Sequence, residues 1–382
     1  MSKKLIPTLD SNDLERVTSP LDKAYTLPAS AYTDADIFNI EVEEIFHKDW
    51  ICIARSEQIA AVGDYLCVDL PHQPLIITHD MNGELHALSR ICLHRAMPIA
   101  EGKGNATRLV CPYHNWTYNL DGQLRSAPMM DDVEHFEREN CKLPEISLEI
   151  WHGFIFVNMS KDPKPLATQL EGLNARIHNY HFEDLVIADT LEFDSNWNWK
   201  ILVENFMEAY HHIGTHRGSL EPIFPAKNSQ IPDNNNEPWT FLEMPGESDE
   251  SEALSSFSCL SQDQRKSLFA ANVFPTLLFA ASNLSGIWYQ VTVQSEKKFN
   301  LKIHLLLHHE MIGNLPAKAL QKMMGELNTI HEEDISANKG SWAGLNSSLT
   351  KQGRLSLFEK AIWQLNQMWV QRITHSKTRA SD

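Results

Sequence analysis

The sequence predicts an α+β chain of two domains, and three observations support this fold class. The chain has 382 residues, enough for two domains of ordinary size, and 42% of them are hydrophobic. Between Trp50 and about Asn158 the chain shows short β-like runs, two of which are separated by Asn82-Gly83, a strong hairpin signal. Beyond residue 163, long strand-like runs alternate with helical segments. We therefore expect a small β domain followed by a larger domain of strands and helices.

The elements are expected in the following order. Residues 1–37 form an N-terminal arm that packs on the second domain, and a helix over 38–47 opens the first domain, which spans 38–162. A linker with two prolines leads into the second domain, 163–382. The last helix of that domain should bury one apolar stripe, because apolar residues recur at three-four spacing. The stripe consists of Leu355, Phe358, Ile362, Leu365, Trp369 and Ile373.

Inside the second domain, strands are expected over 277–280, 286–291 and 301–307, and a helix over 316–338. Residues 225–266 are polar, acidic and poor in periodicity. We expect them to form a mobile loop, which is either a lid or an insertion.

Composition excludes some classes of function. The net charge of −17, from 33 basic and 50 acidic residues, argues against nucleic acid as a partner. No apolar run approaches the ~20 residues that a membrane span needs, and the first residues lack the apolar core of a secretory signal. Four cysteines, Cys52, Cys67, Cys141 and Cys259, are scattered and are expected to be buried free thiols, as in a reducing cytoplasm.

Two short Cys-His clamps are the most informative feature of the chain. Cys92-Leu93-His94 is followed, after sixteen residues, by Cys111-Pro112-Tyr113-His114. Two thiolates and two imidazoles suit a mixed-ligand [2Fe-2S] centre, in which two cysteines hold one iron and two histidines hold the other. A tetrahedral zinc site is the alternative, since Cys2His2 also suits zinc. Zinc fingers usually separate the Cys pair from the His pair, whereas each clamp here mixes the two ligand types.

A second constellation lies over residues 204–216, which contain three histidines and two glutamates. Two histidines and a carboxylate that leave coordination positions open form the facial triad of non-haem Fe(II) oxygenases. His212 and His216 stand four apart, which regular helix geometry favours. His211 and His216 stand five apart, which requires the helix to loosen, and Gly214 makes this loosening plausible. The spacing alone leaves both pairs open.

The wording around the clamps resembles the cluster signature of Rieske oxygenases. The chain reads Cys92-Leu93-His94-Arg95 and Cys111-Pro112-Tyr113-His114-Asn115-Trp116, followed by Asp121-Gly122. Asn115 replaces the glycine that is usual after the second histidine, which affects the local turn and not the ligands. Respiratory Rieske proteins carry an additional cysteine pair near the cluster, and this chain shows none there. The resemblance implies a small all-β Rieske [2Fe-2S] domain and a helix-grip-type catalytic domain with an antiparallel sheet and long helices.

The second constellation is also similar to this family. Asn198-Trp199-Lys200 and Glu204-Asn205-Phe206-x-Glu208-x-Tyr210-His211-x4-His216 resemble the catalytic motif of the α subunits. On that pattern His211 and His216 bind iron, and Glu208 is the acidic residue that bridges the two metal centres. His212 is then a supporting or solvent-facing residue.

The family's third iron ligand is a carboxylate far down the chain. Glu332-Glu333-Asp334-Ile335, followed by Gly353-Arg354-Leu355-Ser356, is similar to the corresponding run. The resemblance places Asp334 as the ligand, with Glu333 as the alternative. Trp342 and Ala343 depart from the usual Gln and Arg. Taken alone, these carboxylates would indicate only a solvated helix face.

The resemblance covers residues 38–375 and implies a terminal oxygenase that uses O2. Because the sequence shows no nicotinamide or flavin motif, NAD(P)H would act only indirectly, through a separate flavin reductase or a ferredoxin. The family is commonly trimeric, so a homotrimer is expected. From the composition we expect no nucleic acid partner, no membrane partner and a cytoplasmic location.

The substrate is a small molecule whose class the motifs leave open. The wording is similar to oxygenases of quaternary ammonium compounds such as carnitine, choline and betaines, and an aromatic cage would suit such a cation. The candidate aromatic residues are Phe206, Tyr210, Trp239, Phe241, Trp288 and Tyr289. Core packing is the alternative role of each. Aromatic-ring hydroxylation or aryl demethylation is the second activity considered, and an electron carrier without oxygenase activity is the third.

Overall fold

The computed structural model describes residues 9–246 and 257–375. Part of the expected loop, 247–256, therefore lies outside the described residues, as do 1–8 and 376–382. The chain divides into two compact units, one formed by His47–Pro163 and the other by the segments before and after it.

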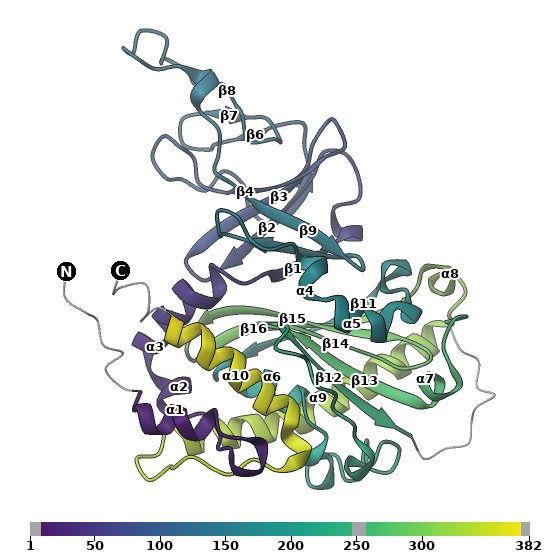
Figure 1. Ribbon diagram of the computed structural model, residues 1–382. Coiled ribbons are helices and arrows are strands. Elements are labelled where there is room, and N and C mark those ends of the chain that lie inside the picture. Colours follow the sequence, from purple (N-terminus) through teal and green to yellow (C-terminus); the bar gives the residue numbers. More distant parts are fainter. Residues whose placement is uncertain (1–8, 247–256, 376–382) are drawn as a thin grey trace. The chain divides into compact units, whose positions relative to one another are not determined.

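The unit His47–Pro163 is built from β-strands. Its main sheet has seven strands in the order β1-β10-β9-β4-β3-β2-β5, and all neighbours are antiparallel (Figure 1). These strands are β1 (Ile51–Arg55), β2 (Asp64–Leu70), β3 (Gln73–His79), β4 (Leu85–Ser89), β5 (Lys103–Asn105), β9 (Glu145–Trp151) and β10 (Phe154–Asn158). The hairpin predicted at Asn82-Gly83 is confirmed, because β3 and β4 pair across it and Gly83 has a φ of 89°.

A small second sheet of this unit carries the surroundings of the Cys-His clamps. It consists of β6 (Leu109–Val110), β7 (Thr117–Tyr118) and β8 (Leu124–Ser126). Trp116, Tyr118 and Leu120 pack together with Cys92 and Cys111 in one buried cluster. The two cysteines thus belong to the core of the unit, which fixes their positions.

The other unit contains one six-stranded antiparallel sheet in the order β11-β16-β15-β14-β13-β12. The strands are β11 (Leu185–Ser195), β12 (Trp239–Pro245), β13 (Ser267–Val273), β14 (Leu277–Ala281), β15 (Gly286–Ser295) and β16 (Lys298–His308). Its helices are α1 (Ser11–Val17), α2 (Ser30–Thr33), α3 (Ala35–Glu41), α4 (Leu166–Gln169), α5 (Glu171–Ile177), α6 (Trp199–Phe206), α7 (Gln262–Lys266), α8 (His309–Ile312), α9 (Ala317–Leu345) and α10 (Lys360–His375). The predicted α+β class, with an antiparallel sheet and long helices, is confirmed.

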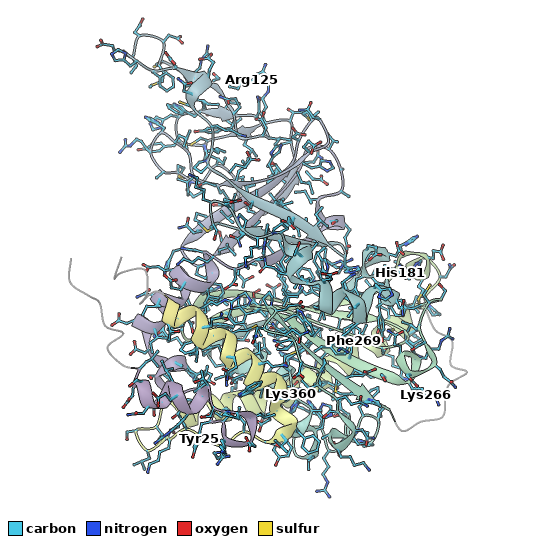
Figure 2. The ribbon with its side chains drawn as sticks, in the orientation of Figure 1. Tyr25, Arg125, His181, Lys266, Phe269 and Lys360 are labelled. Atoms are coloured by element: carbon cyan, nitrogen blue, oxygen red, sulfur yellow. The ribbon has the colours of Figure 1, made fainter. Side chains whose placement is uncertain are left out.

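The two faces of this sheet differ, because successive side chains of a strand point to opposite faces. Phe269 of β13 is 1% exposed and lies in the interior of the unit, whereas Lys266, the last residue of α7, directly precedes the strand (Figure 2). The Phe269 ring packs edge-on against Tyr180 and Phe279, which closes one face with aromatic residues. The residues that alternate with these side chains, such as Ala270 and Ala280, face a cavity.

The N-terminal arm packs against α6 and α10 of the same unit. Glu41 of α3 is fully buried and accepts a hydrogen bond of 2.5 Å from Lys200 and one of 2.6 Å from Trp369. These hydrogen bonds connect the end of α3, which follows the arm, to α6 and α10. The hydroxyl of Tyr32 also donates to Glu204, at 2.6 Å.

Several expected boundaries need correction. The all-β unit begins at His47 and not at residue 38, because the apolar residues Ile37 and Phe38 of α3 are buried in the other unit. Residues 239–245 of the expected loop form the strand β12, whose short apolar run was obscured by polar flanks. Helix α9 continues to Leu345.

Two further expectations differ from the structure. The C-terminal stripe begins inside α10 at Ile362, while Phe358 precedes that helix and is 38% exposed. Of the four scattered cysteines, Cys52 alone is buried and Cys259 is exposed. Among the described helices, none combines the length and apolarity needed to cross a membrane.

Candidate metal centres

The first Cys-His clamp is shaped by a tight backbone turn. The Cys92 amide donates to the carbonyl of Met97 at 2.9 Å, and the Ala96 amide donates to the carbonyl of Cys92 at 3.1 Å. Ala96 adopts a φ of 55°, a conformation that is uncommon for residues with a Cβ. The turn places His94 on the surface, while Cys92 is 3% exposed.

The second clamp has the same kind of backbone turn, and it occurs at Asn115, the residue that departs from the family's usual motif. Asn115 has a φ of 58°, and its amide donates to the carbonyl of Cys111 at 3.0 Å. Asparagine enters the left-handed region more readily than most residues with a side chain. It therefore keeps the turn for which the family usually has glycine.

The two clamps lie side by side, with buried thiols and exposed imidazoles. Cys111 is 2% exposed, and the rings of His94 and His114 lie 4.6 Å apart. Trp116 stacks on His94 with an interplanar angle of 6°. This separation of a sulfur end from a nitrogen end suits a two-iron group better than a single zinc ion, around which all four donors must converge.

Tyr118 supports the sulfur end of this site. Its hydroxyl lies 3.3 Å from Sγ of Cys92 and accepts a hydrogen bond of 3.0 Å from the Leu93 amide. Since the oxygen already accepts from that amide, its proton is available to the sulfur. Burial and the neighbouring Cys92 raise the pKa of Tyr118, so the hydroxyl remains a donor.

The second site begins where helix α6 ends. Asn198 caps its N-terminus by accepting from the Lys200 amide, and the helix stops at Phe206. The chain continues through a short 3-10 helix at Tyr210–Ile213, after which the Thr215 amide donates to the carbonyl of His211 at 2.8 Å. This loosening brings His211 and His216 to the same place despite their spacing of five.

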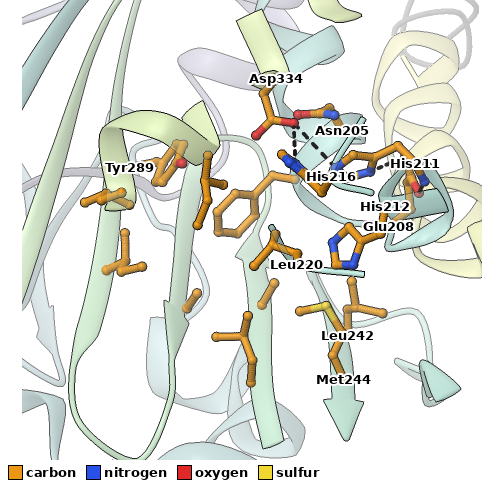
Figure 3. Close-up of a pocket in the computed structure, with 17 residues that line it drawn as sticks. Asn205, Glu208, His211, His212, His216, Leu220, Leu242, Met244, Tyr289 and Asp334 are labelled. Atoms are coloured by element: carbon orange, nitrogen blue, oxygen red, sulfur yellow. Dashed lines mark hydrogen bonds and ion pairs between the residues drawn. The ribbon is translucent and has the colours of Figure 1, made fainter. Parts of the chain in front are cut away.

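Three side chains converge here from distant positions in the chain (Figure 3). Oδ1 of Asp334, on α9, lies 2.9 Å from Nε2 of His216 and 3.4 Å from Nε2 of His211. One ligand atom from each of the three residues lies within 4.8 Å of the others. Two imidazole nitrogens and one carboxylate oxygen at this spacing are a donor set for Fe(II) with open coordination positions.

The electrostatics of these groups follow from their contacts. Burial opposes the charged form of Asp334, but hydrogen bonds from His211 and His216 hold its pKa well below the usual range. Burial lowers the pKa of His211, yet hydrogen bonds to Asp334 and Glu208 raise it to about 10. A metal cation at this position would displace the shared protons, because metal ligands bind in their deprotonated form.

His212 has a different environment. It is 3% exposed, and its Nδ1 lies 3.1 Å from the carbonyl of Phe224. Burial and the positive charge of His211 lower the pKa of His212 to about 4. The alternative in which His212 faces solvent is therefore wrong, and His212 is not part of the convergent group.

A carboxylate contacts the Nδ1 atom of each histidine of this group, on the side of the ring away from Asp334. Oε1 of Glu208 accepts from Nδ1 of His211 at 2.7 Å, and its Oε2 accepts from the His211 amide at 2.8 Å. Oε2 of Glu333 accepts from Nδ1 of His216 at 2.7 Å and from the Ser219 hydroxyl at 2.6 Å. Such contacts fix the tautomer and orientation of a metal-ligating histidine. The structure thus places Glu333 behind His216, a role that the sequence reasoning missed.

A cavity of about 110 Å³ adjoins the convergent group (Figure 3). Its lining comes from α6 and the following turns, from the strands β12 to β15, and from α9. The lining residues other than the three convergent side chains are Asn205, Phe206, Glu208, His212, Leu220, Leu242, Met244, Leu268, Ala270, Ala280, Ile287, Tyr289, Leu327 and Ile330. The site therefore combines metal-binding donors with a mainly apolar cavity.

These two sites and the two folds define an iron-dependent oxygenase architecture, and comparisons with known proteins identify the family. Residues 182–375 match the model of the "Ring hydroxylating alpha subunit (catalytic domain)", and residues 49–137 match that of the "Rieske [2Fe-2S] domain". The chain belongs to the ring-hydroxylating alpha subunit family. The predicted Rieske domain and mononuclear-iron catalytic domain are confirmed by these matches.

Curated relatives carry names of quaternary ammonium oxygenases. The chain is 34% identical over 205 residues to the carnitine monooxygenase oxygenase subunit of Acinetobacter baumannii. This match covers 53% of this chain and 55% of the relative. It is 32% identical over 203 residues to the glycine betaine monooxygenase oxygenase subunit of Pseudomonas aeruginosa, covering 53% and 47%. The matched region thus spans about half the length of these relatives.

The fold is also found in solved structures. A crystal structure of a quaternary ammonium Rieske monooxygenase in complex with an inhibitor matches with a TM-score of 0.81. The match covers 96% of this chain and 99% of that chain at 23% identity, so it shows a shared fold.

Proposed function

We propose that the chain is the terminal oxygenase component of a Rieske-type system, which inserts oxygen from O2 into a small organic substrate. The observation that carries this proposal is the convergence of His211, His216 and Asp334 beside a cavity with a mainly apolar lining. An electron carrier without oxygenase activity needs neither the three donors nor the cavity. The resulting reaction would be a hydroxylation or an oxidative demethylation or cleavage.

Each proposed group has residues that fit it. Cys92, His94, Cys111 and His114 would hold the [2Fe-2S] cluster, and His211, His216 and Asp334 would hold mononuclear Fe(II). When bound, these groups would supply one-electron delivery and O2 activation. The aliphatic side chains around the cavity would reduce the access of water to the reacting end of the substrate.

Glu208 is proposed to act as a positioning and bridging residue. Both of its carboxylate oxygens already hold His211. On the family pattern it would also link this histidine to a cluster histidine of a neighbouring subunit in a homotrimer. Electrons would come from a separate flavin reductase or a ferredoxin, with NAD(P)H as the indirect source. The four cysteines outside the clamps all lie in the described part of the chain as free thiols, which supports a cytoplasmic setting.

Two substrate classes have support. The names of the curated relatives favour quaternary ammonium compounds such as carnitine or glycine betaine. The aliphatic lining of the cavity favours an aromatic or other apolar molecule instead.

The aromatic cage considered from the sequence finds little support in the structure. Of its six candidate residues, Phe206 and Tyr289 line the cavity. The ring of Phe241 stacks on Phe269, and that of Trp288 on His304, away from the cavity. Tyr210 is 47% exposed.

The experiment that tests the proposed function is a single turnover of the purified protein. The chain, reconstituted with iron and sulfide and chemically reduced, is mixed with isotopically labelled O2 and a panel of small molecules of both classes. We expect one labelled oxygen atom in a product, together with cluster oxidation that depends on substrate. Cluster oxidation without labelled product across the panel would favour the electron-carrier alternative.

A further inference from the structure

The floor of the cavity is a row of four residues aligned across four strands. Leu242 of β12 pairs with Ala270 of β13, Ala270 pairs with Ala280 of β14, and Ala280 pairs with Ile287 of β15. Cross-strand partners share a face of the sheet. All four line the cavity beside the proposed iron site, and Figure 3 labels Leu242 among them.

Two alanines in the middle of this row give the floor its depth. Ala270 and Ala280 are 4% and 6% exposed, and each is flanked in the row by a larger aliphatic residue. Their strand neighbours Phe269 and Phe279 point to the opposite face, where they pack together. The small side chains therefore form a trough that runs between Leu242 and Ile287.

The remaining walls are aliphatic as well. Met244 and Leu268 extend the floor as a second paired row. Leu220, Leu327 and Ile330 cover it from the connecting turn and from α9. The polar lining residues belong to α6 with its following turns, or to α9 at Asp334, apart from Tyr289 on β15.

The lining offers no partner for a charged substrate group away from the metal end. Among the described residues that line the cavity there is no lysine and no arginine. The two carboxylates of the lining, Glu208 and Asp334, are engaged by the histidines. A metal ion at the three donors would add positive charge beside the cavity.

The two aromatic rings in the lining are directed at each other. The ring centroids of Phe206 and Tyr289 lie 4.9 Å apart with an interplanar angle of 55°. Tyr289 also contacts the ring of His331, at 5.7 Å. A cation would require open ring faces around it, and a single tilted pair encloses no cation.

We propose that the substrate of this chain is a neutral, hydrocarbon-rich molecule without carboxylate or ammonium group, whose apolar end lies in the trough between Leu242 and Ile287. This inference rests on the proposed function and narrows its substrate class. The proposed substrate class excludes the zwitterionic compounds carnitine and glycine betaine, after which curated relatives are named. Burying an unpaired charge in such a lining is strongly unfavourable, whereas burying hydrocarbon is favourable.

The size of the cavity limits the part of the substrate that it encloses. The volume of about 110 Å³ is somewhat smaller than the roughly 150 Å³ of an apolar cavity that holds benzene. A compact branched alkyl group or a small ring fits this limit.

A matched pair of probes tests the charge preference in the unmodified holoprotein. Choline and 3,3-dimethylbutan-1-ol, below called dimethylbutanol, have the same shape. In the second compound carbon replaces the cationic nitrogen. Equilibrium binding, measured by calorimetry, should be about tenfold or more tighter for dimethylbutanol, because the cation loses its hydration without gaining a counter-charge. Glycine betaine should show no binding stronger than choline. Binding of choline or glycine betaine that equals or exceeds that of dimethylbutanol would overturn the proposal.

The labelled-O2 experiment distinguishes this failure from failure of the proposed function. Oxygen transfer to glycine betaine or choline, with none to the neutral isostere, rejects the neutral class but retains the oxygenase. Preferential binding of the neutral isostere, with no labelled product from any probe, retains the trough and rejects the oxygenase.

A variant of the trough tests the location. Ala280→Leu should fill the floor and weaken dimethylbutanol binding by about tenfold or more, because overpacking removes the space. Ala317→Leu, at an exposed position at the start of α9, is the matched control and should bind like the parent. Iron content and thermal unfolding verify that both variants are folded. Unchanged binding in folded Ala280→Leu places the ligand elsewhere and rejects the trough.

Discussion

The two metal regions of this chain are assembled over very different sequence distances. The cluster clamps are local, since sixteen residues separate His94 from Cys111 and each clamp is closed by its own turn. The iron donors are not local, because Asp334 meets His216 across 118 positions. The first region depends on backbone conformation at Ala96 and Asn115, the second on packing of α9 against the α6 region.

This difference affects how each site is supported. The cysteines sit in a hydrophobic core cluster and need few polar partners. The histidines of the iron site are held by carboxylates from behind, Glu208 for His211 and Glu333 for His216. We therefore expect different substitutions at the iron site to affect metal binding, electron transfer or the orientation of a histidine one at a time. The cluster site should remain intact in each of them.

The largest effect is expected for His211→Ala. Removal of one of three protein donors should lower the iron content by about one atom per chain and abolish turnover, because the remaining two donors bind Fe(II) weakly. The visible absorption of the cluster should be unchanged. The measurements are iron and acid-labile sulfide analysis together with the absorption spectrum.

His212→Ala is the matched control for this prediction. His212 is the neighbouring histidine, but its ring contacts the Phe224 carbonyl and it is not part of the convergent group. It should retain the mononuclear iron. If His212→Ala loses this iron and His211→Ala keeps it, the assigned pair of histidines is wrong.

Glu208→Gln should produce the next largest effect. The amide keeps the length of the side chain but loses the charge and one acceptor that hold His211. Both metal groups should remain, while product formation by the reduced protein slows about 10–100-fold. Stopped-flow mixing with O2 and substrate would measure this step. Cluster reoxidation at the parental rate with normal product yield would show that Glu208 is not needed for electron transfer to the iron site.

Local features of the unit that carries the clamps were predictable from the sequence. The Cys-His clamps and the hairpin at Gly83 depend on short-range turn chemistry, which the residue types reveal directly. The departure at Asn115 was expected to disturb the turn, but asparagine tolerates the positive φ that the turn needs.

Features that depend on packing were not predictable from spacing. Helical spacing favoured His212 over His211, and only the resemblance pointed to His211, because the loosening after α6 is a tertiary effect. The contact between Glu333 and His216 depends on the direction in which α9 presents its side chains. The trough at Ala270 and Ala280 depends on strand register, and alanines in a sequence give no signal of it.

Glu333→Gln tests the support of the second histidine. The hydrogen bond to Nδ1 of His216 weakens when the carboxylate becomes an amide. The affinity for Fe(II) should fall by about tenfold, which is at the low end of the loss expected for a residue that hydrogen-bonds a metal ligand. The side chain is 33% exposed, so water partly replaces the lost contact. The measurement is competitive metal titration of the iron-depleted protein.

Glu332→Gln is the matched control, since Glu332 is exposed on the same helix turn. It should bind iron like the parent protein. Equal affinities in both variants would mean that Glu333 does not orient His216.

The smallest effect is expected in the cluster region, at Tyr118. Its hydroxyl is positioned by the Leu93 amide to donate to Sγ of Cys92, and hydrogen bonds to cluster sulfurs raise the reduction potential. Tyr118→Phe removes this donor and keeps the ring in the core. A net hydrogen bond of roughly 0.5–1.5 kcal/mol corresponds to a fall of roughly 20–65 mV, at 59 mV per tenfold for one electron. Redox titration followed by visible absorption measures it, with Tyr113→Phe, at an exposed ring, as the control. An unchanged potential in Tyr118→Phe would show that the Tyr118 hydroxyl does not influence the reduction potential of the cluster.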